Sequence, residues 1–239
     1  SDVHELLERG FRLDAPDGLS TLIPCASTWT DAQRSARPDE PHPIVVAADP
    51  AAIGPVDVVL VATKTTDTAG ALHLVPPLLG PDTVVVAVQN GLGVEEPLAE
   101  VAPHNPVLGA MAFLCSHKVG PAHVHHLDYG RITVGARTPS GLAAGVTPEV
   151  ADVVADLAAA GLDAVALDDL STGRWKKLVW NIPYNGMSVV LDATTHELMA
   201  QANTRALVEA LMVEVITAAA ACGHPIERSF VDAMLADTE

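Results

Sequence analysis

The stretch VDVVLVATK, residues 56–64, decides the fold, because it is a continuous run rich in β-branched residues that ends in a lysine. Such runs are typical of strands that are covered on both faces, as in a parallel sheet. Two further apolar runs follow, TVVVAVQN (83–90) and PVLGAMAFL (106–114). The stretches between the runs, 68–79 and 93–102, have helical patterns. This alternation predicts right-handed βαβ units and a mostly parallel sheet.

The pattern of the sequence changes after residue 120. AHVHHLDYG (122–130) and RITVGA (131–136) predict two strands that are joined at Gly130 and added to the sheet in antiparallel orientation. TPEVADVVADLAAAG (147–161) starts with Thr and Glu and ends in glycine, which predicts a capped helix. LDAVALDDL (162–170) predicts a last strand.

Only helical patterns follow Ser171. One predicted helix begins with RWKKLVWN, and the second covers residues 196–223 and is closed by a glycine. We therefore expect an α/β domain at residues 1–168 and an all-α domain at residues 169–239. The apolar stretch 196–222 of the second helix, rich in Ala and Val, offers surface suited to a homodimer.

Neither end of the chain has the pattern of a domain end. Residues 1–13 predict a helix followed by a strand, whereas a dinucleotide-binding domain opens with a strand and a Gly-rich turn. Residues 229–239 stop within an apparent helix. We therefore expect the first domain to be incomplete at its N-terminus and the second at its C-terminus.

Composition excludes several classes of protein. Thirteen basic residues against thirty acidic ones give a net charge of −17, which argues against nucleic-acid binding because phosphate contacts need clustered Lys and Arg. No apolar run is long enough for a transmembrane helix, and no signal peptide is visible. Cys25, Cys115 and Cys222 are too few and too widely spaced for a disulfide framework or a zinc site, which favours a cytoplasmic protein.

KKLVWNIPYN, residues 176–185, combines polar and apolar residues within a predicted helix. Lys177, Asn181 and Asn185 are spaced four apart and would form a polar stripe along one helix face. Buried amides and a buried ammonium need partners, and Pro183 removes a backbone donor in the same segment. This pattern favours a ligand at the stripe, and the alternative is a solvated helix face with a proline kink.

QNGLGVEEP, residues 89–97, follows a predicted strand and precedes a helix. It resembles part of a phosphate-binding loop, but Glu95 and Glu96 at the helix start would repel a pyrophosphate. We interpret it as a turn at the carboxyl edge of the sheet, where α/β proteins bind ligands. Asn90 lies at this edge, and Lys64 lies at the end of the preceding strand. Two polar residues at adjacent strand ends suggest a shared site.

The histidines at 123, 125 and 126 raise the alternative of a metal site. A strand would place the first two on one face and the third on the other, and no paired carboxylates accompany them. We interpret them as polar strand residues and expect no metal. At residues 194–197, the sequence TTHE predicts a helix start with Thr194 or Thr195 as the N-cap.

The motifs VVLVATKTTDT, VAVQNGLGVEE and RWKKLVWNIPYNGMSVVLDATTHELM resemble, in order and spacing, those of the 2-dehydropantoate 2-reductases, also called ketopantoate reductases. The resemblance covers nearly the whole chain and includes the signature K-L-x-x-N-x-x-x-N. It implies an NADPH-dependent reductase of a 2-oxo acid, in pantothenate biosynthesis. It also implies a Rossmann-like first domain, a helical domain for substrate binding and dimerisation, and a site between the two.

The resemblance also implies roles for individual residues. Lys177 matches the catalytic lysine of the family. The implied substrate contacts are Asn181, Asn185, Thr195 and Asn90. The implied cofactor contacts are Lys64, Asn90 and Cys115. In this interpretation the Lys177 ammonium protonates the alkoxide that forms when hydride reaches the ketone carbon.

Three departures from the family pattern matter, and the third, together with the unusual stretch VHHLDYGR (124–131), leaves the particular 2-oxo acid open. The chain lacks the glycine-rich loop and the segment with the family's late serine and glutamate, and Thr195 stands where the best-known members have an asparagine. One alternative is a redox-inactive ligand-binding or regulatory protein on the same fold. Another is a reductase of a different oxo acid, or a 3-hydroxy acid dehydrogenase, which would also carry a lysine and an asparagine four apart. The Q-N-G turn and the second asparagine favour the ketopantoate reductase pattern over the last of these.

Overall fold

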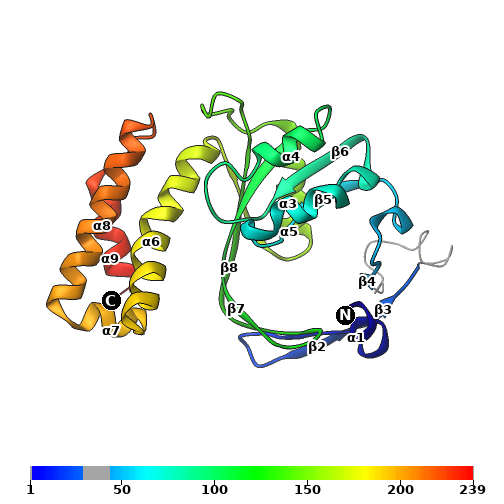
Figure 1. Cartoon of the computed structure of the whole chain (residues 1–239), viewed down its shortest axis with the longest axis horizontal. Helices are drawn as coiled ribbons and strands as arrows, with labels where there is room; N and C mark the ends of the chain where they lie inside the picture. Colours follow the sequence, from blue (N-terminus) through cyan, green and yellow to red (C-terminus); the bar gives the residue numbers. More distant parts are fainter. Residues whose placement is uncertain (1, 29–43, 239) are drawn as a thin grey trace.

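The structure is a computed structural model that describes residues 2–28 and 44–238 of the 239-residue chain. A mixed sheet with helices on both faces forms one part of the molecule, and a group of helices from the C-terminal region forms the other (Figure 1). No helix within the described ranges combines the length and the apolar character that crossing a membrane requires.

The strands come from the N-terminal two-thirds of the chain. They are β1 (Phe11–Asp14), β2 (Ser20–Ile23), β3 (Cys25–Ala26), β4 (Ile44–Val45), β5 (Val56–Val61), β6 (Leu79–Ala87), β7 (Val107–Gly120), β8 (His123–Ala136) and β9 (Asp163–Leu167). Seven strands form one sheet in the order β2-β1-β8-β7-β6-β5, with β9 paired to β8, whereas β3 and β4 pair with each other. The pairs β5–β6, β6–β7 and β8–β9 are parallel, which confirms the predicted mostly parallel sheet.

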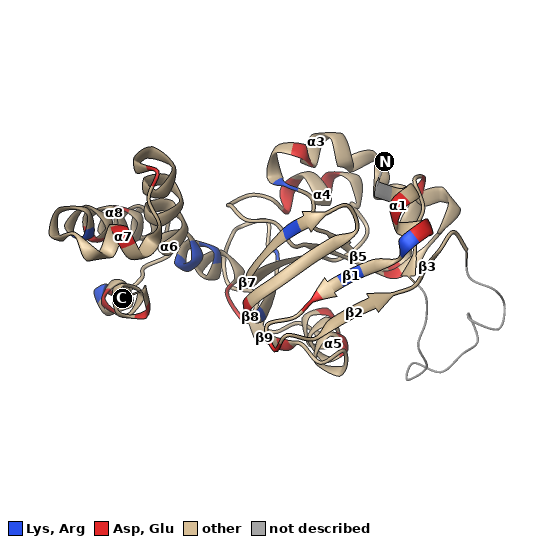
Figure 2. Cartoon of the chain, turned by 90° about the horizontal axis from the view of Figure 1, so that it is seen from below, with Lys and Arg blue, Asp and Glu red and all other residues tan. Residues whose placement is uncertain are grey.

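The helices cover the sheet and then continue beyond it. They are α1 (Asp2–Arg9), α3 (Thr68–Ala71), α4 (Glu96–Val101), α5 (Pro148–Ala159), α6 (Leu170–Leu191), α7 (Thr195–Ala200), α8 (Ala202–Ala221) and α9 (Arg228–Thr238), with 3-10 turns η1 (Pro50–Ala52), η2 (Thr65–Asp67), η3 (Leu72–Leu74) and η4 (Pro76–Leu78). In Figure 2, α3 and α4 lie on one face of the sheet and α5 on the other. The α5 helix has the predicted caps, since the Thr147 side chain accepts a hydrogen bond from the Val150 amide and Gly161 has a positive φ.

The centre of the sheet is built from the apolar runs of β5, β6 and β7. Val59 pairs with Val85, which in turn pairs with Val107. Val85 and Val86 are almost completely inaccessible to solvent, although their side chains point to opposite faces. Strands buried on both faces therefore need apolar residues at successive positions, which is the pattern that the sequence contains.

The prediction of two strands joined at Gly130 was wrong, because β8 is one continuous strand. It forms a long antiparallel hairpin with β7 that reaches beyond the central sheet to β1 and β2 (Figure 1). Phe113 pairs with Arg131 and Leu114 with Tyr129, so Gly130 is an extra residue in a β-bulge. Tyr129 and Gly130 have positive φ angles, and this backbone conformation accommodates the extra residue within the strand.

Two predicted helices are interrupted. The stretch 68–79 forms α3 followed by two 3-10 turns, because Pro76 and Pro77 cannot donate the backbone hydrogen bonds of an α-helix. The long helix predicted at 196–223 is divided into α7 and α8 at Gln201, whose backbone is extended. Thr204 Oγ1 donates to the carbonyl oxygens of Leu198 and Gln201 and so holds this break.

The C-terminal helices pack around the middle of α6. The buried core of this group consists of Val179, Tyr184, Met187, Leu198, Val208, Met212, Val215, Ile216, Ala219, Ile226, Val231 and Leu235. The α6 helix continues for 22 residues through Pro183, which is itself buried. The Lys and Arg residues of α6 lie in the part of the helix that is nearest the sheet (Figure 2).

Candidate functional site

The first turns of α6 pack directly against strands β7 and β8. The Asp169 side chain caps the helix by accepting a hydrogen bond of 2.9 Å from the Thr172 amide. Glycines make the close approach possible: an added Cβ on Gly135 would lie 3.1 Å from Leu170 Cβ, and one on Gly173 would lie 3.0 Å from Met111 Cε. Side chains on this face of α6 therefore reach the sheet.

Lys177 projects from α6 to β7. Its Nζ donates a 2.5 Å hydrogen bond to the carbonyl oxygen of Ala112 and lies 4.6 Å from the centre of the Phe113 ring. Lys176 is exposed, with its Nζ 5.7 Å from the centre of the Phe230 ring. The helix thus directs the two adjacent lysines to different surroundings, and Lys177 is the one that faces the sheet.

The surroundings of Lys177 lower its pKa from the ordinary value of 10.5 to about 8. Burial is the main cause, because desolvation disfavours the charged amine, and the positive charge of Arg174 adds to it. An amine with this pKa is still mostly protonated at neutral pH. It is therefore a better proton donor than an exposed lysine while remaining charged.

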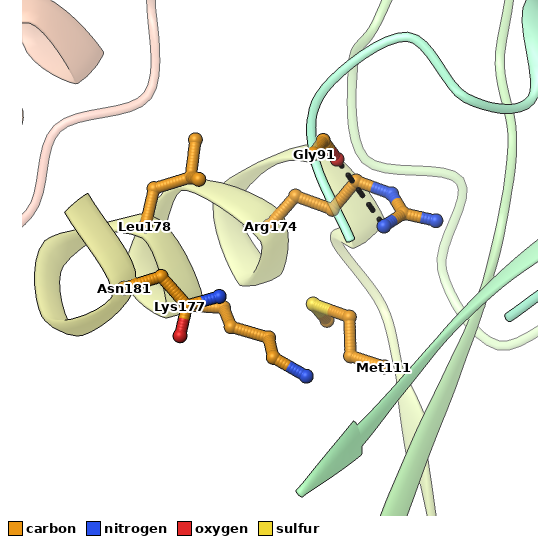
Figure 3. Close-up of a pocket in the computed structure, with 6 residues that line it drawn as sticks. All are labelled: Gly91, Met111, Arg174, Lys177, Leu178 and Asn181. Carbon is orange, nitrogen blue, oxygen red and sulfur yellow. Dashed lines mark hydrogen bonds between the residues drawn. The ribbon is translucent and has the colours of Figure 1, made fainter. Parts of the chain in front are cut away.

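A pocket lies between α6 and the edge of the sheet (Figure 3). Its lining residues are Gly91, Met111, Arg174, Lys177, Leu178 and Asn181. Two members of the predicted polar stripe, Lys177 and Asn181, are thus brought together with Gly91, the residue that follows Asn90. In the close-up, the Lys177 side chain extends from the helix towards β7.

The other predicted substrate contacts lie farther along the helices. Asn185, two turns after Lys177, is exposed, and it is not one of the described residues that line the pocket. Thr195 is the half-buried first residue of α7. Thr194 is the N-cap of this helix: its side chain accepts from the Glu197 amide, and the Glu197 carboxylate accepts from the Thr194 amide.

Lys64 and Asn90 follow the carboxyl ends of the neighbouring parallel strands β5 and β6, and both are exposed. Thr65 Oγ1 donates a 2.9 Å hydrogen bond to the Asn90 carbonyl oxygen, so the two strand ends are directly connected. Below them, Gln89 Nε2 donates to the Thr63 carbonyl oxygen at 2.8 Å. The side chains predicted to share a site therefore lie at one edge of the sheet.

Cys115 is exposed on β7, where it pairs with Asp128 on the long hairpin. His123, His125 and His126 are half-buried residues of β8, and His123 Nε2 lies 2.7 Å from Asp14 Oδ2. The pKa of Asp14 is well below its usual range because of hydrogen bonds from Ser20, His123 and Arg12. Within residues 2–28 and 44–238, no three His, Cys, Asp or Glu side chains gather in a way that could hold a metal ion.

Sequence reasoning missed a buried ion pair between Arg174 and Glu95. The Arg174 side chain is 3% exposed and that of Glu95 is 5% exposed. We expected Glu95 to repel a phosphate, but its carboxylate is turned inwards and neutralised by the guanidinium. Arg174 lies one helical turn before Lys177, and this spacing could have indicated that the two side chains share a helix face. Nothing in the sequence indicated the partner of Arg174, because Glu95 lies 79 positions away.

The fold and the site together define a class of protein, in which a Rossmann-like sheet domain is followed by a helical domain and a lysine of the first long helix lies beside a pocket at the edge of the sheet. The match to protein families identifies the member of this class. Residues 2–139 match the model described as "Ketopantoate reductase PanE/ApbA", and residues 169–239 match "Ketopantoate reductase PanE/ApbA C terminal". The chain belongs to the ketopantoate reductase family.

Individual relatives agree with this assignment. A 2-dehydropantoate 2-reductase of Nostoc sp. is 44% identical over 242 residues, which cover 98% of this chain and 70% of the relative. A second, from Mesorhizobium japonicum, is 28% identical and is covered over 57% of its length. The crystal structure of 2-dehydropantoate 2-reductase from Geobacter metallireducens has a TM-score of 0.83 at 34% identity, with 100% of this chain and 72% of that chain covered.

Proposed function

We propose that the protein containing this chain is an NADPH-dependent reductase that converts 2-dehydropantoate, a 2-oxo acid, into the 2-hydroxy acid pantoate. Family membership supports the reaction. The observation that carries the proposal is the position of Lys177, whose half-buried ammonium lies beside a pocket at the edge of the sheet. A cation in this place can stabilise negative charge that develops on a substrate oxygen.

The nicotinamide cofactor, when bound, supplies the hydride that reduces the ketone carbon. The residues of the chain fit such a cofactor, because Lys64 and Asn90 are exposed at the carboxyl edge of the parallel strands, where α/β sheets bind nucleotides. Glu95 does not oppose binding, since its charge is buried against Arg174. We assign cofactor contacts to Lys64, Asn90 and Cys115.

Lys177 would hold the proton that the substrate oxygen receives as the ketone becomes an alkoxide. A pKa of about 8 keeps this proton on Nζ at neutral pH and allows its transfer to the far more basic alkoxide. We assign substrate contacts to Asn181, Asn185, Thr195 and Asn90. Their amide and hydroxyl groups would bind the hydroxyl and carboxylate of the substrate by hydrogen bonds without adding charge to the site.

The remaining assignments rest on the family and on the sequence. We place the boundary between the dinucleotide-binding and the helical domain at residues 168 and 169, directly before α6. We propose NADP as the cofactor, a cytoplasmic location and a homodimer. A ketopantoate reductase from Staphylococcus aureus is described as dimeric, and its structure has a TM-score of 0.66 to this chain.

The test is a steady-state assay of the whole protein with 2-dehydropantoate and a panel of other 2-oxo acids, each with NADPH and with NADH. We expect the highest kcat/KM with 2-dehydropantoate and tighter binding of NADPH than of NADH in a fluorescence titration. If the protein prefers another 2-oxo acid, the proposed substrate is wrong but the proposed reaction, reduction of a 2-oxo acid, still holds. Absence of turnover with every acid, despite binding of the nucleotide, would refute the proposal in favour of a redox-inactive protein.

A further inference from the structure

We propose that Arg174 is a positioning residue that holds the turn carrying Asn90 at a set distance from the helix carrying Lys177. The proposal rests on the proposed function, because it concerns how the two sides of that site are aligned. It assigns no contact with substrate or cofactor to Arg174.

The hydrogen bonds of Arg174 connect two parts of the molecule that are far apart in sequence. Its Nη1 donates to the carbonyl oxygen of Gln89 at 2.8 Å and to that of Gly91 at 3.3 Å, the second of which is drawn in Figure 3. These two carbonyls flank Asn90 on either side. The Asn90 backbone is therefore held between two bonds from one guanidinium, while its side chain remains exposed.

Glu95 fixes the direction of the guanidinium. Arg174 Nε donates a 2.6 Å hydrogen bond to Glu95 Oε1, and Nη2 forms an ion pair with the same oxygen. A further bond of 3.4 Å joins Nη2 to the carbonyl oxygen of Ala87, the last residue of β6. A buried ion pair is stable only when its remaining donors have partners, and the backbone of the turn provides them.

The sheet leaves space for this pair at Gly109 on β7. An added Cβ at this position would lie 2.2 Å from Glu95 Oε1 and 2.7 Å from Leu170 Cδ2. Any side chain here would displace the carboxylate, the start of α6, or both. The turn, the strand and the helix are thus packed around one buried charge pair.

Lys177 lies three residues after Arg174, so the two side chains share one face of α6. Both line the same pocket. Movement of Arg174 relative to the turn would therefore change the distance between the Lys177 ammonium and Asn90. Reactions that require alignment of two groups can lose about 100-fold in rate for a misplacement of about 1 Å.

Arg174→Lys is the decisive variant, because it keeps the positive charge and loses the planar fork of donors that reaches several carbonyls at once. Glu95→Gln tests the same link from the other side, and Gly109→Ala disturbs it without changing any charge. The matched controls are Arg228→Met, which breaks an exposed ion pair to Glu209 elsewhere, and Gly120→Ala on the same strand, where an added Cβ would meet no described heavy atom within 4 Å.

The measurements are kcat and KM with 2-dehydropantoate and NADPH, well below the unfolding temperature, and hydrogen exchange of the peptide covering residues 88–95. We expect kcat to fall about 10- to 100-fold in Arg174→Lys, Glu95→Gln and Gly109→Ala, with a smaller change in KM for NADPH, because only one of the three proposed cofactor contacts lies in the turn. Exchange should rise in the turn and remain unchanged in α8. Both controls should match the wild type.

Lower thermal stability in these variants with wild-type kcat and wild-type exchange in the turn would overturn the proposal, because the pair would then only stabilise the fold. If the wild type reduces no 2-oxo acid, the proposed function fails, and hydrogen exchange alone decides the positioning role. Unchanged exchange at residues 88–95 in Arg174→Lys would then refute it.

Discussion

Replacement of Lys177 by methionine tests the chemistry most directly. Methionine keeps most of the aliphatic volume beside Phe113 and removes the ammonium that donates to the Ala112 carbonyl oxygen. Loss of a positioned acid typically lowers kcat by about 10²–10⁴. We expect a decrease in this range for the reduction of the 2-oxo acid by the whole protein, with the fold retained.

The pH dependence supplies the magnitude that is specific to this structure. With its pKa lowered to about 8, Lys177 is about nine-tenths protonated at pH 7 and about one-tenth protonated at pH 9. The rate of reduction should therefore fall about tenfold for each pH unit above 8, whereas an exposed lysine would keep the rate level to about pH 10. Lys177→Met should abolish this alkaline decrease together with most of the activity.

The assay follows NADPH oxidation from pH 6 to 10 at substrate concentrations well below KM, because kcat/KM reports the pKa values of the free enzyme, with circular dichroism as a check on folding. Lys176→Met is the matched control, because it removes an adjacent ammonium that is exposed above Phe230. This variant should keep the wild-type rate and pH profile. If Lys176→Met is inactive and Lys177→Met is active, the assignment of the helix face is refuted. If both variants have wild-type activity, neither lysine is the proton donor.

Three other substitutions and one titration test the remaining steps. Asn181→Ala should raise KM for the 2-oxo acid by an amount equivalent to about 1–3 kcal/mol, because a substrate group loses its partner, and should change kcat less; an unchanged KM would contradict the assigned contact. Thr194→Ala should lower the free energy of unfolding by about 1 kcal/mol through loss of the α7 capping box, as measured in urea, and Thr194→Ser should restore it. Met212→Ala should cost about 2–5 kcal/mol by leaving a cavity among the C-terminal helices, and a cost near zero would mean that the core collapses around it. The wild-type free energy of unfolding should increase as pH rises from about 8 to 10.5. Over this range Lys177 keeps its proton in the unfolded state but has released it in the folded state, and stability rises with pH wherever the unfolded state binds more protons. Lys177→Met should lack this increase.

Local patterns in the sequence determined most of the elements that support the site. The apolar runs predicted β5, β6 and β7, because strands buried on both faces require apolar residues at successive positions. The caps of α5 could be predicted from Thr147 and Gly161, since capping depends on residues within a few positions of the helix end. Helical spacing alone distinguished Lys177 from Lys176, as side chains one residue apart point about 100° apart.

Only the tertiary structure decided the features that depend on distant partners. The pairing of Arg174 with Glu95 joins positions 79 residues apart, and nothing in either local pattern specifies it. The continuity of β8 through Gly130 depends on the facing strand β7, which accommodates the bulge along the length of the hairpin. The pKa of Lys177 likewise follows from burial and from the charge of Arg174. Periodicity and capping are properties of neighbouring residues, whereas burial, register and charge pairing arise only when separate segments pack together.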